Sequence, residues 1–74
     1  MQYILGYLIC KGQQSEDVRK VQDRLIQLGY SCGKYGADSI FGRDTESTVK
    51  AFQRNNGLAV DGIVGKDTWS KLFY

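Results

Sequence analysis

The sequence predicts an all-α fold: a small three-helix bundle with two similar loop–helix repeats and a short N-terminal extended segment. Apolar residues recur at helical spacing between residues 15 and 28, glycine-rich stretches separate three helical patterns, and one eight-residue motif occurs twice. A chain of 74 residues has room for one domain. We therefore expect residues 1–74 to form a single domain, with residues 1–10 extended and residues 11–74 as the three-helix core.

The composition is that of a globular protein without a strong charge preference. Hydrophobic residues make up 42% of the chain, and ten basic residues against eight acidic ones give a net charge of +2. The basic residues form no stripe, so a nucleic-acid partner is not expected. Residues 1–10 are apolar, but they are too short to cross a bilayer and lack the basic start of a signal peptide. We expect no membrane partner, and any export signal should lie outside this sequence.

The first helix is predicted from Ser15 to Leu28. Its apolar stripe consists of Val18, Val21, Leu25 and Leu28, with Ile26 beside it. Ser15 is a typical N-cap, and Gly29 is placed to end the helix in a left-handed conformation. Cys10 and Cys32 flank this helix, and a disulfide between them would require the N-terminal segment to double back. The sequence leaves that disulfide open.

Two further helices are predicted, each after a glycine-rich loop. The second covers residues 44–55, because Thr45, Val49 and Phe52 share one face and Asn56-Gly57 stops the pattern. The third is shorter and covers residues 66–73. One core should link all three helices. Its predicted members are Val21, Leu25, Phe41, Val49, Phe52, Ile63, Trp69 and Leu72.

The repeated motif reads D-x-I-[FV]-G-[RK]-D-T and spans Asp38–Thr45 and Asp61–Thr68, 23 residues apart. Its Asp can accept hydrogen bonds from the backbone of its own turn. The Ile and the following Phe or Val can insert into the core, and the Gly permits a backbone φ that other residues resist. All of this is structural chemistry, and none of it requires a ligand.

Further motifs flank the repeat. They are D-V-x-x-[LV]-Q at Asp17–Gln22, L-G-Y at Leu28–Tyr30, A-F-Q at Ala51–Gln53 and N-G-L at Asn56–Leu58. With them the chain resembles, from Lys11 to Leu72, the three-helix peptidoglycan-binding domains that are attached to bacterial and phage cell-wall amidases, carboxypeptidases and muramidases. It differs from the family pattern in lacking Pro after Gly42 and Gly65, and in having Ser39 where Gly is usual.

The resemblance implies a non-catalytic module that binds peptidoglycan and targets an attached or partner cell-wall hydrolase. The partner would be the glycan strand or the stem peptide, and a catalytic domain would be fused in a larger chain. The place of action would be extracellular, at the cell wall, reached by export or by a phage lysin route. Weak wall binding would raise the local concentration of the tethered enzyme. We expect a monomer that needs no cofactor and no metal.

The ligand-binding site is predicted as a shallow groove at the end of the second helix and its adjoining loops. Its residues are Tyr30, Gln53, Asn56, Asp61 and Trp69, with Arg43 at the edge. Glycine loops let a ligand approach backbone donors, and amides suit the acetamido and peptide groups of peptidoglycan. Structural roles stay open as alternatives: Gln53 and Asn56 can brace the loop, Asp61 can serve its own turn, and Trp69 is also a predicted core residue.

Other functions are less well matched by the residues. The chain has no His, so a catalytic Cys–His pair is excluded, and Asp44 with Glu46 suits a helix start as well as glycoside hydrolysis. The alternative is a dockerin-like or phage structural module for protein–protein interaction. A dockerin binds calcium, but the ligand positions that follow Asp38 and Asp61 hold Ile and Gly. An enzyme is not expected.

Overall fold

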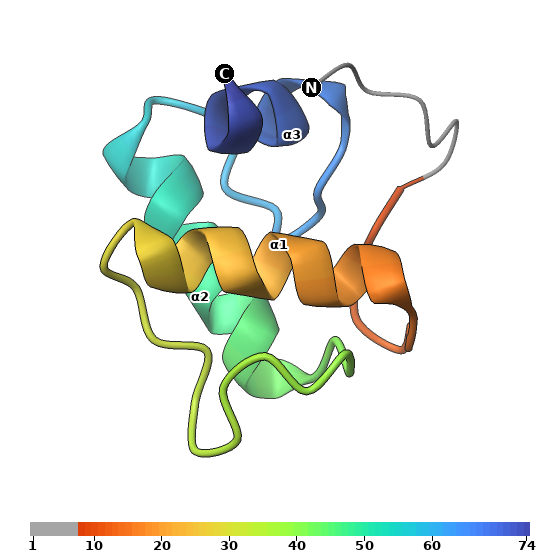
Figure 1. The fold of residues 1–74 in the computed structure, drawn as a ribbon. Helices are drawn as coiled ribbons and strands as arrows, with labels where there is room; N and C mark the ends of the chain where they lie inside the picture. Colours follow the sequence, from red (N-terminus) through yellow and green to blue (C-terminus); the bar gives the residue numbers. More distant parts are fainter. Residues whose placement is uncertain (1–7) are drawn as a thin grey trace.

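The computed structural model describes residues 8–74, which form three α-helices (Figure 1). These are α1 (Glu16–Gln27), α2 (Arg43–Asn55) and α3 (Lys66–Phe73). Helix α1 lies across α2 and also packs against α3, so it links the other two helices. The predicted all-α three-helix fold is confirmed. Residues 1–7, which hold most of the predicted extended segment, lie outside the described residues.

Helix α1 begins and ends as its sequence predicts. The Ser15 hydroxyl accepts a hydrogen bond from the Val18 backbone N–H at 3.2 Å, which satisfies one of the free amides of the first turn. Gly29 follows the helix with a φ of 97°, in the left-handed region that ends helices. No helix in the part of the chain that the structure describes is long and apolar enough to span a membrane.

Helices α2 and α3 begin after Gly42 and Gly65, and both glycines have extended backbone with φ of −110° and −99°. The prediction that these motif glycines supply an unusual φ was therefore wrong. The left-handed positions lie three residues earlier, at Ser39 with φ 70° and Gly62 with φ 73°. The tight turn follows directly after the motif Asp, whose side chain closes that turn, so the left-handed residue is needed there.

The core joins all three helices, as predicted, with one exception among the eight predicted members. Its buried apolar residues are Ile9, Val18, Val21, Leu25, Cys32, Phe41, Val49, Phe52, Val64, Trp69 and Leu72. Ile63 is only half-buried, and its counterpart Ile40 is 49% exposed. Successive side chains of extended backbone point to opposite sides. Because Phe41 and Val64 point inward, the Ile before each of them faces outward.

Residues 9–14 tie the two repeats together. Ile9 pairs with Val64 through two backbone hydrogen bonds of 3.1 and 2.8 Å, and Gln14 forms a second antiparallel bridge with Ile40. The Phe41 N–H also donates to the Gln13 carbonyl at 2.9 Å. The short segment before α1 therefore acts as a strand for both loops, although the described residues contain only these isolated bridges.

Both cysteine thiols are free in the structure. Cys32 is buried, and its Sγ donates to the Gln22 carbonyl at 3.8 Å. Burial, with smaller contributions from the carboxylates of Asp38 and Asp23, raises the pKa of the Cys32 thiol to about 11. Cys10 is only partly buried. The disulfide that the sequence left open is not formed.

Candidate functional site

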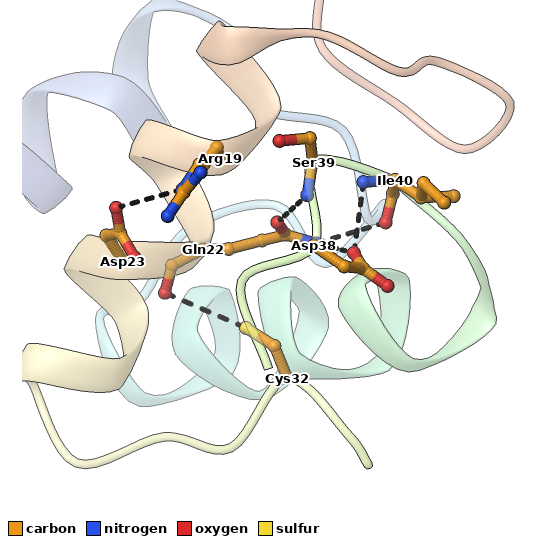
Figure 2. A network of polar contacts seen from close by, with 7 residues as sticks. All are labelled: Arg19, Gln22, Asp23, Cys32, Asp38, Ser39 and Ile40. Carbon is orange, nitrogen blue, oxygen red and sulfur yellow. Dashed lines mark hydrogen bonds and ion pairs between the residues drawn. The ribbon is translucent and has the colours of Figure 1, made fainter. Parts of the chain in front are cut away.

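A buried glutamine from the preceding helix holds the first repeat loop. Figure 2 shows Gln22 reaching from α1 into the loop that contains Asp38, Ser39 and Ile40. Its Nε2 lies within 3.1 Å of Asp38 Oδ1, 3.0 Å of the Ile40 carbonyl and 2.9 Å of Thr45 Oγ1. Its Oε1 accepts from the Ser39 N–H at 2.9 Å. One amide therefore fixes the whole turn before α2.

Gln53 does the same for the second repeat. Its Nε2 lies 3.0 Å from Asp61 Oδ1, 3.0 Å from the Ile63 carbonyl and 3.1 Å from Thr68 Oγ1. Its Oε1 accepts from the backbone N–H groups of Asp61 and Gly62 at 3.1 and 3.0 Å. We call each arrangement a glutamine clasp. In both repeats, the glutamine that holds the loop comes from the helix before it. The structural repeat therefore includes a residue that precedes the repeated sequence motif.

The motif aspartates close their own turns, as the structural reading of the sequence proposed. Asp38 Oδ1 accepts from the Ile40 N–H at 3.0 Å, and Asp61 Oδ1 accepts from the Ile63 N–H at 2.9 Å. The Ile40 N–H, followed by the Gln22 amide, holds the pKa of Asp38 below its usual range. Each Oδ1 also accepts a hydrogen bond from a clasp glutamine, so this oxygen has a structural role.

The structure does not bring the six predicted site residues into one groove. Gln53 is 1% exposed and Trp69 is 2% exposed. The Gln53 amide is already bonded at both of its polar atoms, and the Trp69 ring packs on Phe73 with centroids 4.4 Å apart. Both side chains are therefore buried beneath the loop and in the core, and their role as ligand contacts stays a prediction.

The other four predicted residues are more accessible but dispersed. Asn56 is the exposed C-cap of α2 and donates to the Phe52 carbonyl at 2.8 Å. Tyr30 is half-buried with its ring edge-on to Phe52, and its hydroxyl accepts from Asn55. Arg43 lies at the first repeat and Asp61 at the second. Asp61 alone is both exposed and next to a sizeable pocket.

That pocket has a volume of about 430 Å³ and lies over the second repeat. We call it the second-repeat pocket. Among its lining residues are Leu58, Asp61, Ile63, Lys66 and Asp67, together with Leu8 from the segment before α1. Gln53 and Thr68 also line it, but their polar side-chain atoms already form the hydrogen bonds of the clasp. Pockets of this size suit small organic ligands.

The first repeat has a smaller counterpart of about 130 Å³, lined by the same motif positions and by Cys32 and Tyr35. Arg43 here corresponds to Lys66 in the second-repeat pocket. The difference in volume makes the second repeat the better candidate site. Lys66 and Asp67 line the larger pocket but are not among the residues that the sequence predicted for the site. Both belong to the repeated motif, whose [RK]-D positions the sequence explains by the start of a helix alone.

The second-repeat pocket combines charges of both signs with apolar surface. Lys66 and Asp67 are exposed in the first turn of α3, Asp61 is exposed in the loop before it, and Leu8 is 54% exposed. No three His, Cys, Asp or Glu side chains among residues 8–74 lie where they could hold a metal ion. Such a site can orient a small polar ligand, and it presents no assembled nucleophile and base.

A small helical fold with an open pocket of mixed polarity is typical of a binding module. The chain belongs to the peptidoglycan binding domain family, whose model matches residues 14–72. The predicted family resemblance is thereby confirmed.

Several relatives share this domain. The N-acetylmuramoyl-L-alanine amidase CwlL of Bacillus licheniformis is 44% identical over 67 residues, which cover 90% of this chain and 19% of the amidase. The crystal structure of the SleB N-terminal domain superposes with a TM-score of 0.85 at 36% identity, covering 95% of this chain and 93% of that one. The Burkholderia AP3 phage endolysin superposes with a TM-score of 0.81 at 37% identity, covering 90% of this chain and 25% of that one.

Proposed function

We propose that this chain is a non-catalytic module that binds peptidoglycan through the second-repeat pocket and holds a cell-wall hydrolase at its substrate. The match of residues 14–72 to the peptidoglycan binding domain family carries the proposal. The chain spans only 19% of each of two Bacillus licheniformis amidases that it matches, and 29% of a solved Clostridium acetobutylicum protein described as a fused amidase, peptidase and peptidoglycan-binding protein. Such proportions favour a module carried beside a catalytic domain.

The module would act by avidity. A single shallow pocket binds weakly, roughly in the micromolar to millimolar range, but a tether keeps the enzyme near an insoluble polymer between catalytic events. The rigid clasps support this mechanism, because loops that are already ordered lose little conformational entropy when a ligand binds. The module would work as a monomer, outside the cell and at the wall.

The acidic residues of α2 favour a binding role over catalysis. Asp44 and Glu46, the pair considered for glycoside hydrolysis, both lie in the first turn of α2, where acids stabilise the helix dipole. Glu46 is also 4.0 Å from the Lys11 ammonium. The 130 Å³ hollow beside Asp44 offers little room for a sugar ring and its leaving group.

Co-sedimentation with purified sacculi tests the proposal. The 74-residue chain should pellet with sacculi at low salt and stay in the supernatant with cellulose, an insoluble polysaccharide that lacks stem peptides and amino sugars. Equal recovery in both supernatants would contradict peptidoglycan binding. Incubation with sacculi should also release no soluble fragments, because the chain is proposed to be non-catalytic.

A further inference from the structure

We propose that the second-repeat pocket binds the stem peptide of peptidoglycan rather than its glycan strand. The inference rests on the proposed function and names the part of the polymer that the same pocket recognises. The two parts differ in chemistry. The glycan is a neutral chain of pyranose rings apart from its lactyl links, whereas the stem peptide carries free carboxylates, alanine methyl groups and the amine of a diamino acid.

Charge complementarity is the first argument. The rim of the pocket holds one ammonium, from Lys66, and two carboxylates, from Asp61 and Asp67. All three residues are exposed. Only Oδ1 of Asp61 is used by the turn and the clasp, and Lys66 forms no ion pair within the described residues. A rim with both signs of charge matches a peptide with carboxylates and an amine better than it matches an uncharged sugar.

The start of α3 adds backbone hydrogen-bond donors for a carboxylate. Gly65 is its N-cap and, unlike Ser15 at α1, has no side chain to cap the first turn. Gly65, Lys66, Asp67 and Thr68 all line the pocket. The unbonded amide N–H groups of a helix start bind anions, so they can act together with the Lys66 ammonium on one carboxylate.

The apolar lining is the third argument. Leu8, Leu58, Ala59 and Ile63 offer aliphatic surface of the size of alanine side chains. Aromatic rings, which pack well on pyranose faces, are absent from the pocket lining among the described residues. The most exposed rings, Tyr35 and Tyr74, lie against other hollows. The pocket therefore lacks the platform expected of a glycan site.

NMR titration of the 15N-labelled chain with two soluble probes tests this inference. One probe is a free stem tetrapeptide with a diamino acid at its third position, and the other is a chitin oligosaccharide, a neutral glycan of N-acetylated pyranose rings. The peptide should shift the amide resonances of residues 58–68, and the glycan should not. Shifts caused by the glycan alone, by both probes equally, or by neither while the chain still pellets with sacculi would each overturn the stem-peptide assignment. Loss of sacculus binding itself would instead overturn the proposed function.

A matched pair of variants tests the role of Lys66. Lys66→Gln removes the rim cation and should weaken stem-peptide binding roughly fivefold, the effect of about one exposed charge pair. Arg43→Gln makes the same change at the equivalent position of the first repeat and should leave peptide affinity unchanged. Both residues are exposed, so both variants should melt with the wild type. Equal affinities for the two variants would contradict a carboxylate contact at Lys66.

Discussion

At the scale of single residues, the two clasp glutamines define this molecule. Gln22 and Gln53 are both fully buried polar side chains, and each is bonded at both ends of its amide. A buried amide is tolerated only when its partners are supplied, and here the partners are loop backbone, the motif Asp and the motif Thr. The Asp and Thr of the repeated motif are therefore explained by the fold before any ligand is considered.

The clasp predicts a stability effect for Gln53→Ala. The substitution leaves two loop N–H groups, one carbonyl and the Thr68 hydroxyl without their partner, so it should lower the free energy of unfolding by about 2–3 kcal/mol. Urea denaturation measures this. Gln27→Ala, at an exposed position of α1, is the control and should change stability by less than about 0.5 kcal/mol. Equal denaturation midpoints for the two variants would show that the clasp is energetically neutral.

Ser39 is the strained member of the repeat. It has a φ of 70°, whereas the equivalent position of the second repeat is Gly62 with a φ of 73°. Left-handed backbone costs a residue with a side chain about 1–2 kcal/mol, which the greater freedom of glycine in the unfolded chain partly offsets. Ser39→Gly should therefore raise the melting temperature by roughly 2–6 °C.

A helical serine provides the control for that substitution. Ser47→Gly, at an exposed position inside α2, should instead lower stability by about 0.5 kcal/mol, because glycine is a poor helix former. If Ser39→Gly is destabilising as well, backbone strain is not what distinguishes the first repeat.

The Cys32 thiol should be unreactive in the folded chain. Its pKa is raised from 9.0 to about 11 by burial, so the neutral thiol is favoured by folding. This contribution to stability is complete below pH 9 and is lost as the pH rises through about 11. With Ellman's reagent at pH 8, the native chain should react rapidly at Cys10 alone, and the denatured chain at both thiols. Rapid reaction of two thiols in the native state would contradict the buried position.

At the scale of elements, the segment before α1 completes the fold. Ile9 is 0% exposed and pairs with Val64, and Gln14 pairs with Ile40, so one short stretch contacts both repeat loops. Helix α1 packs against both α2 and α3. Residues 9–14 and helix α1 therefore contact both repeats. These contacts explain how loops with several glycines keep a fixed shape.

This arrangement predicts that Ile9→Ala is strongly destabilising. Removing a fully buried isoleucine side chain should cost about 2–4 kcal/mol, as for helix residues of the core. Val60→Ala, at a 45% exposed position of the second loop, is the matched aliphatic control and should cost less than about 0.5 kcal/mol. Thermal melts measure both. An Ile9→Ala variant that melts with Val60→Ala would show that residues before α1 are dispensable.

At the scale of the whole molecule, the two repeats have similar structures, but the hollows above them differ in size. Both repeats place a clasp, an Asp turn and a helix start in the same order, yet the hollows above them measure about 430 and 130 Å³. The second repeat borders Leu8 and the 58–59 segment, whereas the first borders Tyr35 and Cys32. The single site proposed above the second repeat suits a tethering role, in which weak binding is strengthened by repeated attachment to a polymer.

The sequence by itself determined the three helices, nearly all of the core and the family. Helical periodicity, the Ser15 cap and the repeated motif are local or linear features, so they can be read without a fold. Only the tertiary structure decided which polar residues are buried. The clasp partners of Gln53 lie 8 to 15 residues further along the chain, so its role depends on where a distant loop packs. For the same reason the predicted groove residues are dispersed. Gln53 and Asp61 line the second-repeat pocket and Arg43 lines the smaller hollow, whereas Lys66 and Asp67 join Asp61 as the proposed contacts.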